Sequence, residues 1–204
     1  MARHLVCITG ASGAIYALRL IAALASEGSI VHVTCSPWGG RVMLEETGRP
    51  LGYWLGKIRA KGGPGGTPAI LTLHRPDDFA SPVASGSFSL DGTVIAPCSM
   101  GTLGAISSGV SGNLIHRAGA VALKEGWPLI VVPRETPLSL IALRGMTSLK
   151  EAGAIILPAC PGFYGKPSNM EQLVDQIVHR IMDRLGTPSQ RASRWRDDPD
   201  LQGE

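Results

Sequence analysis

Residues 4–14, with the sequence HLVCITGASGA, decide the fold of this chain. A largely apolar run at 4–9 is followed by a glycine-containing turn and by an Ala- and Leu-rich segment at 15–26. A short continuous apolar run predicts a strand buried on both faces, and the longer segment after it predicts a helix. A buried strand that leads through a tight turn into a helix is the first half of a β-α-β unit.

The same alternation of apolar runs and helical patterns continues along the chain. Further strands are expected at residues 30–35, 70–73, 93–96, 129–132 and 154–157. Further helices are expected at residues 40–47, 103–109, 113–124, 139–152 and 170–185. Residues 48–69 are rich in glycine and proline, so we expect a surface excursion there without regular structure.

These elements predict an α/β fold with a doubly wound parallel sheet, a flavodoxin-like or Rossmann-like three-layer sandwich. At 204 residues, one domain is expected. We place this domain at residues 1–186 and treat 187–204 as a polar C-terminal tail. Trp195 in the tail is a candidate anchor on a neighbouring subunit.

Composition excludes several classes of function. The net charge of +3 is small and dispersed, with no basic stretch interleaved with aromatic residues, which argues against nucleic-acid binding. No apolar run reaches the roughly 18 residues of a membrane span. The N-terminus lacks the layout of a signal peptide, so we expect a cytoplasmic protein. Charged residues make up only 17%, which indicates surface buried against a cofactor or other subunits.

The four cysteines do not have the spacing of a metal site. Cys7, Cys35, Cys98 and Cys160 lie far apart, each in or beside an apolar run. Structural zinc sites usually contain paired C-x-x-C ligands. We therefore expect small buried thiols and no bound metal.

Ligands of an open parallel sheet bind outside the carboxyl ends of its strands, so the residues after each strand form the candidate site. Gly10, Ala11 and Ser12 follow the first strand, where glycine and a helix N-terminus suit a phosphate. An ordinary tight turn is the alternative. The spacing is G-x-x-G rather than the G-x-G-x-x-G of dinucleotide sites.

Hydroxyl side chains follow two further strands. The residues concerned are Ser36, Ser99, Met100, Gly101 and Thr102. Each serine alone is as readily a helix N-cap as a ligand contact. Three hydroxyl-bearing turns at one sheet edge together suit a phosphate with a polar tail, as in FMN.

Charged residues complete the candidate site. Arg134 and Glu135 follow the strand at 129–132, where an arginine can grip a phosphate and a glutamate can act as general acid or base. The alternative is a structural ion pair that caps the following helix. Arg117 and Lys124 lie seven residues apart and share a helix face, either as solvated charges or, with Arg134, around a phosphate. Tyr164 offers a phenol after the last strand.

Six motifs, in this order, resemble the UbiX-type flavin prenyltransferases. They are TGASGAIYALRL, PVASGSF, APCSMGTLGAISSG, NLIHRAGAVALKE, PLIVVPRETPLSLIALRGM and GAIILPACPGFYGKP, and the likeness covers most of residues 5–186. The resemblance implies metal-independent transfer of dimethylallyl from its monophosphate to N5 and C6 of reduced FMN. It also implies a homo-oligomer, usually a dodecamer with active sites between subunits, and a UbiD-type decarboxylase that receives the prenylated flavin.

The resemblance also implies roles for individual residues. Those expected to contact FMN are Gly10, Ala11, Ser12, Ser36, Ser99, Met100, Gly101, Thr102 and Arg134. Those expected to bind dimethylallyl phosphate are Lys124, Tyr164 and Arg180, with Arg117 nearby. Glu135 is the expected acid or base, Ser12 its relay, and Glu46 a second carboxylate for ring closure. Phe79 or Trp195 is the aromatic expected beside the allylic cation.

The chain departs from the family pattern in three places. Phe79 is the nearest aromatic residue at a position where the family often has tryptophan. Gly126 and Trp127 stand where two arginines usually follow the Lys-Glu pair, and the glycine-rich segment at 62–66 has no counterpart. Two other functions stay open. One is an FMN-dependent cysteine decarboxylase, for which His74 is the candidate catalytic histidine. The other is a non-catalytic flavin carrier subunit of a decarboxylase.

Overall fold

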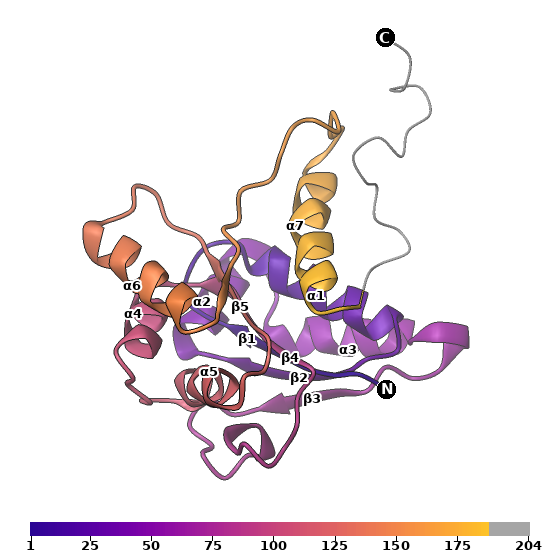
Figure 1. The fold of residues 1–204 in the computed structure, drawn as a ribbon. Helices are drawn as coiled ribbons and strands as arrows, with labels where there is room; N and C mark the ends of the chain where they lie inside the picture. Colours follow the sequence, from indigo (N-terminus) through magenta and orange to yellow (C-terminus); the bar gives the residue numbers. More distant parts are fainter. Residues whose placement is uncertain (188–204) are drawn as a thin grey trace.

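The computed structural model describes residues 1–187, which form one parallel sheet between two layers of helices (Figure 1). The strands are β1 (Arg3–Ile8), β2 (Ile30–Cys35), β3 (Leu71–His74), β4 (Gly92–Cys98), β5 (Leu129–Pro133) and β6 (Ile155–Ile156). Their order is β3-β2-β1-β4-β5-β6, and all pairs are parallel. The predicted α/β class is confirmed, and the strand order is that of a Rossmann sheet.

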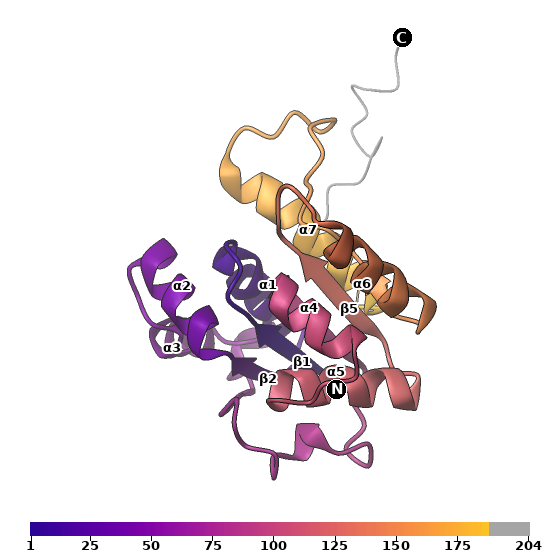
Figure 2. The same ribbon diagram turned by 90° about the vertical axis from the view of Figure 1, so that its left-hand side faces the viewer.

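Helices cover both faces of this sheet (Figures 1 and 2). They are α1 (Ala14–Ser26), α2 (Pro37–Thr47), α3 (Leu51–Lys61), α4 (Met100–Ser107), α5 (Leu114–Glu125), α6 (Leu140–Glu151) and α7 (Met170–Arg184). Short 3₁₀ turns η1 (Pro64–Gly66) and η2 (Pro82–Ala84) lie in the connections. The buried side chains of α1, α3 and α7 form one core with the sheet, and those of α4, α5 and α6 form the other.

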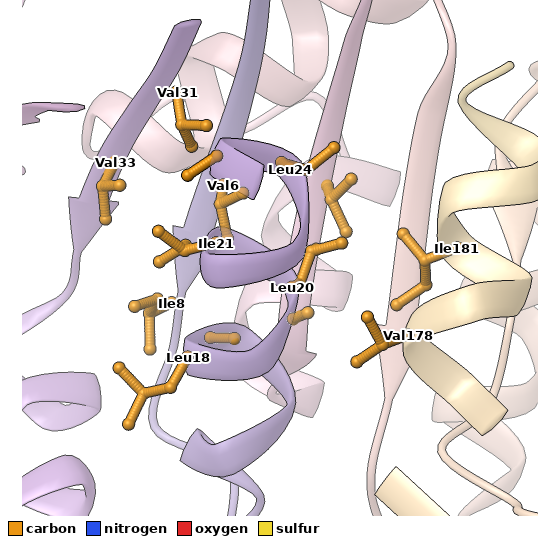
Figure 3. Packing of buried hydrophobic residues seen from close by; sticks show 14 of the residues in the cluster. Val6, Ile8, Leu18, Leu20, Ile21, Leu24, Val31, Val33, Val178 and Ile181 are labelled. Atoms are coloured by element: carbon orange, nitrogen blue, oxygen red, sulfur yellow. The ribbon is translucent and has the colours of Figure 1, made fainter. Parts of the chain in front are cut away.

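The first β-α unit shows why the sequence folds in this way. Alternate residues of β1 enter opposite cores, Val6 and Ile8 on the α1 side. The buried residues of α1 include Leu20, Ile21 and Leu24, which fall on one stripe of a 3.6-residue period. Figure 3 shows these side chains directed at the strands, with residues of α7 beside them. A parallel sheet needs such apolar faces on both sides.

The expectation of an irregular excursion at residues 48–69 was wrong, because α3 occupies the first half of it. Leu51 and Leu55 are buried, and Trp54 and Ile58 pack beside them, a helical spacing. The indole nitrogen of Trp54 donates a hydrogen bond to Thr47 Oγ1 (2.9 Å). The glycines that obscured this pattern, at positions 52 and 56, face solvent.

The cysteines follow the prediction with one exception. Cys7 and Cys98 are buried and Cys35 is partly buried. Burial raises the pKa of Cys35 and of Cys98 to about 12, so these thiols stay protonated. Cys160 is exposed, so its assignment as a buried thiol was wrong. Among residues 1–187, no helix combines the length and apolar character needed to cross a membrane.

Two histidines and a serine form a partly buried chain of hydrogen bonds between the sheet and the segment before β4. His32 Nδ1 lies 2.8 Å from His74 Nε2, and His74 Nδ1 lies 2.8 Å from Ser81 Oγ. Burial lowers the pKa of both rings, and for His32 the nearby His74 and Arg3 also contribute, giving a pKa of about 4. Burial lowers the pKa of the chain's other histidines too, namely His4, His116 and His179.

Stability is therefore expected to fall as the pH drops from about 6.5 towards 4. The lowered pKa values mean that the unfolded chain binds protons in this range before the folded chain does. The stabilisation is complete above pH 6.5 and is lost as the pH approaches the folded-state pKa. Each histidine that is protonated only in the unfolded chain makes the free energy of unfolding fall by up to about 1.4 kcal/mol more per pH unit.

Urea unfolding at pH 7.5, 6.0 and 5.0 measures this effect. The urea midpoint should fall over this range, and His32→Asn should show a shallower fall than the wild type. A midpoint that is the same at pH 7.5 and pH 5.0 would contradict the assignment of neutral buried histidines.

Candidate active site

A buried threonine joins the two central strands at their carboxyl ends. Thr9 Oγ1 donates a hydrogen bond to the carbonyl of Pro97 (2.8 Å) and accepts one from the backbone N–H of Ser99 (2.8 Å). From β1 the strands follow one another outwards to β3, and the chain then returns to β4 on the other side of β1. Ligands of such sheets usually bind at this point, between the carboxyl ends of β1 and β4. Sequence reasoning placed Thr9 at the end of the first strand and missed this link, although the residue stands in the TGASG motif.

The turn after β1 depends on its glycines for steric reasons. A Cβ at Gly10 would lie 2.7 Å from the Cβ of Trp38, so only glycine lets α2 start this close to the turn. Gly13 has a φ of 108°, a left-handed conformation that glycine tolerates. Between them, Ala11 is buried and Ser12 is exposed towards the edge of the sheet. The glycines therefore shape the turn itself, whatever it binds.

Arg134 reaches this turn from the end of β5. Its Nε donates a hydrogen bond to the carbonyl oxygen of Ser12 (3.2 Å). The contact joins residues 122 positions apart in the sequence. It thus brings together the first turn and the Arg-Glu segment, both of which were predicted to contact FMN or its reaction partner.

Glu46 closes the N-terminus of α1. Its carboxylate accepts hydrogen bonds from the backbone N–H of Gly13 (3.0 Å to each oxygen) and of Ala14 (2.8 Å). The N-cap residue Gly13 has no side chain, so a residue of α2 supplies the cap instead. The expectation that this helix end offers free N–H groups to a phosphate is wrong for Gly13 and Ala14. The predicted part of Glu46 in ring closure stays a prediction.

Glu46→Ala is expected to destabilise the protein by about 1–2 kcal/mol, as loss of a helix cap does. The variant removes the partner of two N–H groups at the positive end of α1. Glu45→Ala is the matched control, because Glu45 lies on the same helix and pairs with Arg41 four residues away (2.8 Å). That pair should be worth about 0.3–0.5 kcal/mol. Equal urea midpoints for the two variants would refute the capping role.

The serines after β2 and β4 are helix caps. Ser36 Oγ accepts a hydrogen bond from Gly39 N (3.0 Å), and Ser99 Oγ accepts one from Thr102 N (3.4 Å). Ser99 Oγ also lies 3.2 Å from Thr102 Oγ1. Ser36 Oγ accepts in its cap and keeps its own O–H for a ligand oxygen, whereas the O–H of Ser99 donates to Thr102 Oγ1. Gly101 has open space on its side-chain side.

A hollow of about 430 Å³ adjoins the first turn and is lined by Pro37, Trp38 and Arg41. Trp38 is 72% exposed, unusual for a residue of its size. An aromatic face and a cation beside a glycine turn can stack on a planar ring and pair with a phosphate. Sequence reasoning did not single out Trp38 or Arg41, although an aromatic residue directly after Ser36-Pro37 was a usable signal.

Glu135 is exposed at the end of β5, beside Arg134. Its Oε1 accepts a hydrogen bond from the next backbone N–H, that of Thr136 (3.0 Å). Helix α6 is capped by Ser139, whose Oγ accepts from Ala142 N (3.1 Å). Within residues 1–187, Arg134 and Glu135 form no ion pair, so the helix-capping interpretation of this pair is wrong. Glu135 is placed where a ligand at the sheet edge can meet it.

Lys124, a cation of α5, lies at the opposite end of β5 from Arg134. Lys124 precedes β5 and Arg134 follows it, so one strand length, about 16 Å, separates the two positions along the sheet. Lys124 Nζ contacts the carboxylate of Glu125, and the Lys124 side chain is 64% exposed. Arg117 Nε donates to the carbonyl of Ala84 (3.0 Å). A single chain therefore does not bring Lys124 together with Arg134.

The remaining predicted residues lie around the outer strands. Tyr164 is exposed in the segment between β6 and α7, which extends away from the body in Figure 1. Arg180 is exposed on α7, and Phe79 is half-exposed after β3. Trp195 lies outside the described residues. His74, the candidate histidine of a cysteine decarboxylase, has both ring nitrogens in the hydrogen-bond chain described above.

Comparison with known proteins agrees with this arrangement. The family model described as Flavoprotein matches residues 1–182. The flavin prenyltransferase UbiX of Pseudomonas aeruginosa is 42% identical over 198 residues, covering 95% of this chain and 93% of that protein.

Two solved structures are similar over nearly the whole chain. AnUbiX (PadA1) in complex with FMN and dimethylallyl pyrophosphate has a TM-score of 0.86 and 38% identity, covering 95% of this chain and 97% of the other. A dodecameric FMN-dependent UbiX-like decarboxylase from Escherichia coli O157:H7 has a TM-score of 0.84 and 34% identity, covering 95% and 98%. The chain therefore belongs to the flavoprotein family and, within it, to the UbiX-type flavin prenyltransferases.

Proposed function

We propose that this protein transfers a dimethylallyl group from its phosphate ester to N5 and C6 of reduced FMN. The observation that carries the proposal is the contact between Arg134 and Ser12, because it joins the segment that contains Glu135 to the turn after β1. A relative 38% identical to this chain binds both FMN and dimethylallyl pyrophosphate. We further propose that a UbiD-type decarboxylase receives the product and that the protein works in the cytoplasm.

The residues at the sheet edge suit FMN. The open hollow beside Trp38 adjoins the first turn, and that turn needs glycine at position 10. Arg134 and Arg41 supply cations, and Ser36 keeps a hydroxyl proton to donate. Reduced FMN supplies the nucleophilic N5 and C6 atoms. The proposed contacts to it are Gly10, Ala11, Ser12, Ser36, Ser99, Met100, Gly101, Thr102 and Arg134.

The protein's own task is to hold the phosphate ester and to manage protons and charge. Breaking the ester bond leaves negative charge on the phosphate, which cations placed in advance stabilise. We assign this role to Tyr164 and Arg180 and to Lys124 of a neighbouring copy, with Arg117 nearby. Glu135 exchanges a proton beside the leaving group, and Ser12 relays that proton. Glu46 is the carboxylate that assists ring closure, when the second bond forms at C6.

A shared site explains why Lys124 and Arg134 lie apart in one chain. A second copy has to supply Lys124 if both residues act on one substrate, and a relative 34% identical to this chain is dodecameric. Apolar side chains lie exposed around the start of α6, including Ile141 at 81%. Such a patch suits subunit contact, and we propose a homododecamer.

Mass spectrometry of the flavin tests the reaction. The purified protein, incubated without oxygen with reduced FMN, dimethylallyl monophosphate and EDTA, should yield flavin heavier by one C₅H₈ unit. No other protein should be needed. Unmodified flavin would support the non-catalytic carrier, and oxidative loss of CO₂ from a cysteine peptide would support a cysteine decarboxylase. Replacing FMN by FAD, which the single phosphate-sized turn does not fit, should abolish the product.

A further inference from the structure

The backbone pairing of the two central strands stops before their carboxyl ends. The ladder between β1 and β4 ends at the pair formed by Cys7 and Ile95. Two residues further along β4 stands Pro97, which has no N–H group with which to continue the ladder. The pairing of β4 with β5 is irregular at the same place, since its register shifts between Ile95 and Cys98. Another interaction therefore has to fix the ends of β1 and β4 relative to each other.

The hydroxyl of Thr9 supplies this interaction. It donates to the carbonyl of Pro97 and accepts from the N–H of Ser99, in both cases over 2.8 Å. Thr9 is 1% exposed and Pro97 is also buried. Separating the two strand ends would leave these buried polar groups without partners, which is costly. One hydroxyl thus acts as both donor and acceptor where the ladder is missing.

Two further contacts extend this link into a closed ring of three strand ends. The backbone N–H of Arg134, after β5, donates to the carbonyl of Cys98 at the end of β4 (3.4 Å). The side chain of Arg134 donates to the carbonyl of Ser12 in the turn after β1 (3.2 Å). Because Thr9 joins β1 to β4, each of the three ends is connected to the other two. These ends carry all the residues proposed above to contact FMN, apart from Ser36.

The link through Thr9 differs in kind from the link through the side chain of Arg134. The contact between Arg134 and Ser12 is exposed, so the guanidinium group is free to turn towards a ligand phosphate. The hydroxyl of Thr9 is buried, and both of its hydrogen bonds are made within the protein. Thr9 therefore keeps the two turns in place whether or not a ligand is bound, which lowers the cost of ordering the site on binding.

We propose that Thr9 is a positioning residue for the flavin site, whose hydroxyl fixes the separation of the turns after β1 and β4. This inference rests on the proposed function, which places FMN at these turns. Thr9 acts through its neighbours, namely Ser99 on one side and the turn that begins at Gly10 on the other. A binding site has to be held to within about 0.5 Å of its productive geometry, so a small shift of one turn weakens binding.

Replacement of Thr9 by valine removes the hydroxyl and keeps the shape of the side chain. Flavin-free Thr9→Val protein, titrated with FMN and followed by flavin fluorescence, should bind about tenfold more weakly than the wild type or worse. The reason is that Pro97 and Ser99 lose their common partner and the turns can shift. Thr9→Ser keeps the hydroxyl and should bind FMN with nearly the wild-type affinity. Equal losses of affinity in the valine and serine variants would overturn the proposal.

Thr93→Val is the matched control. Thr93 is another fully buried threonine of the central strands, but within residues 1–187 its hydroxyl has no hydrogen-bond partner. The same replacement there should change neither FMN affinity nor the urea midpoint for the worse. A purely structural Thr9 would lower the urea midpoint of Thr9→Val and leave the FMN affinity of the folded protein unchanged. That combination would also overturn the proposal.

Thr9→Ala provides the measurement if the valine variant does not fold, because alanine leaves room for water between the two polar groups. Its FMN affinity should again lie below that of the wild type, and an unchanged affinity would refute the positioning role. Prenyl transfer is measured separately. Active transfer in the wild type, with normal FMN binding by Thr9→Val, would remove the role of Thr9 and leave the proposed reaction standing. Weakened FMN binding by Thr9→Val, without any transfer by the wild type, would do the reverse.

Discussion

Glu135→Gln is expected to slow the formation of prenylated flavin by about 10²–10⁴-fold, the usual contribution of a general acid or base. The glutamine keeps an oxygen that can accept from the N–H of Thr136, as Glu135 does, so the local backbone should not change. It cannot exchange a proton with the leaving phosphate. Single-turnover measurement without oxygen, from reduced FMN and dimethylallyl monophosphate, follows the chemical step directly.

FMN affinity separates a catalytic Glu135 from a structural one. The Glu135→Gln variant should bind FMN as the wild type does, because Arg134 contacts Ser12 and forms no ion pair with Glu135 within residues 1–187. Glu151→Gln, which removes an exposed carboxylate at the end of α6, should leave both rate and affinity unchanged. Normal chemistry with weakened FMN binding in the Glu135 variant would make this residue part of the scaffold.

Lys124→Ala is expected to reduce the rate by about 10²-fold or more, since it removes a cation from the departing phosphate. The sharper prediction concerns mixtures. If Lys124 acts at the Glu135 of a neighbouring copy, oligomers co-expressed from Lys124→Ala and Glu135→Gln chains contain some sites with both native residues. Random assembly should restore about a quarter of the wild-type activity, because each site draws one residue from each of two subunits.

The double variant is the control for this mixing experiment. Chains that carry both substitutions, co-expressed with wild-type chains, should also give about a quarter of intact sites if the site is shared. A site within one chain would instead give about half with the double variant and none with the two single variants. Mixed oligomers without activity would therefore place Lys124 and Glu135 in the same subunit, against the separation that β5 imposes.

Local periodicity was enough to predict most of the fold. β2 was predicted with its observed bounds, and α7 ends one residue before the expected position. Helix α3 was missed because glycines at its solvent face interrupt a stripe that only packing on the core reveals. Strand order was not predicted, since it depends on contacts between residues far apart in the sequence.

The site residues could be predicted only where they stand together in one short motif of the sequence. The glycine turn and the Arg-Glu segment stand out as motifs at strand ends, and the structure brings them together through Ser12. The roles of Thr9 and Glu46 depend on partners 88 and 33 residues away, which no local pattern encodes. Lys124 was grouped with Arg134 by its charge, although the strand predicted at residues 129–132 already separates the two positions in the sequence.

The shortness of β6 matters for the chain before it meets other copies. An outer strand exposes unpaired backbone groups that can add a strand from another molecule and start aggregation. β6 has two residues, too few to template such pairing, and Lys150, Arg180 and Arg184 lie along it. Two such edges repel one another through these like charges. Newly folded chains are thereby steered away from edge-to-edge stacking and left to associate through their helices.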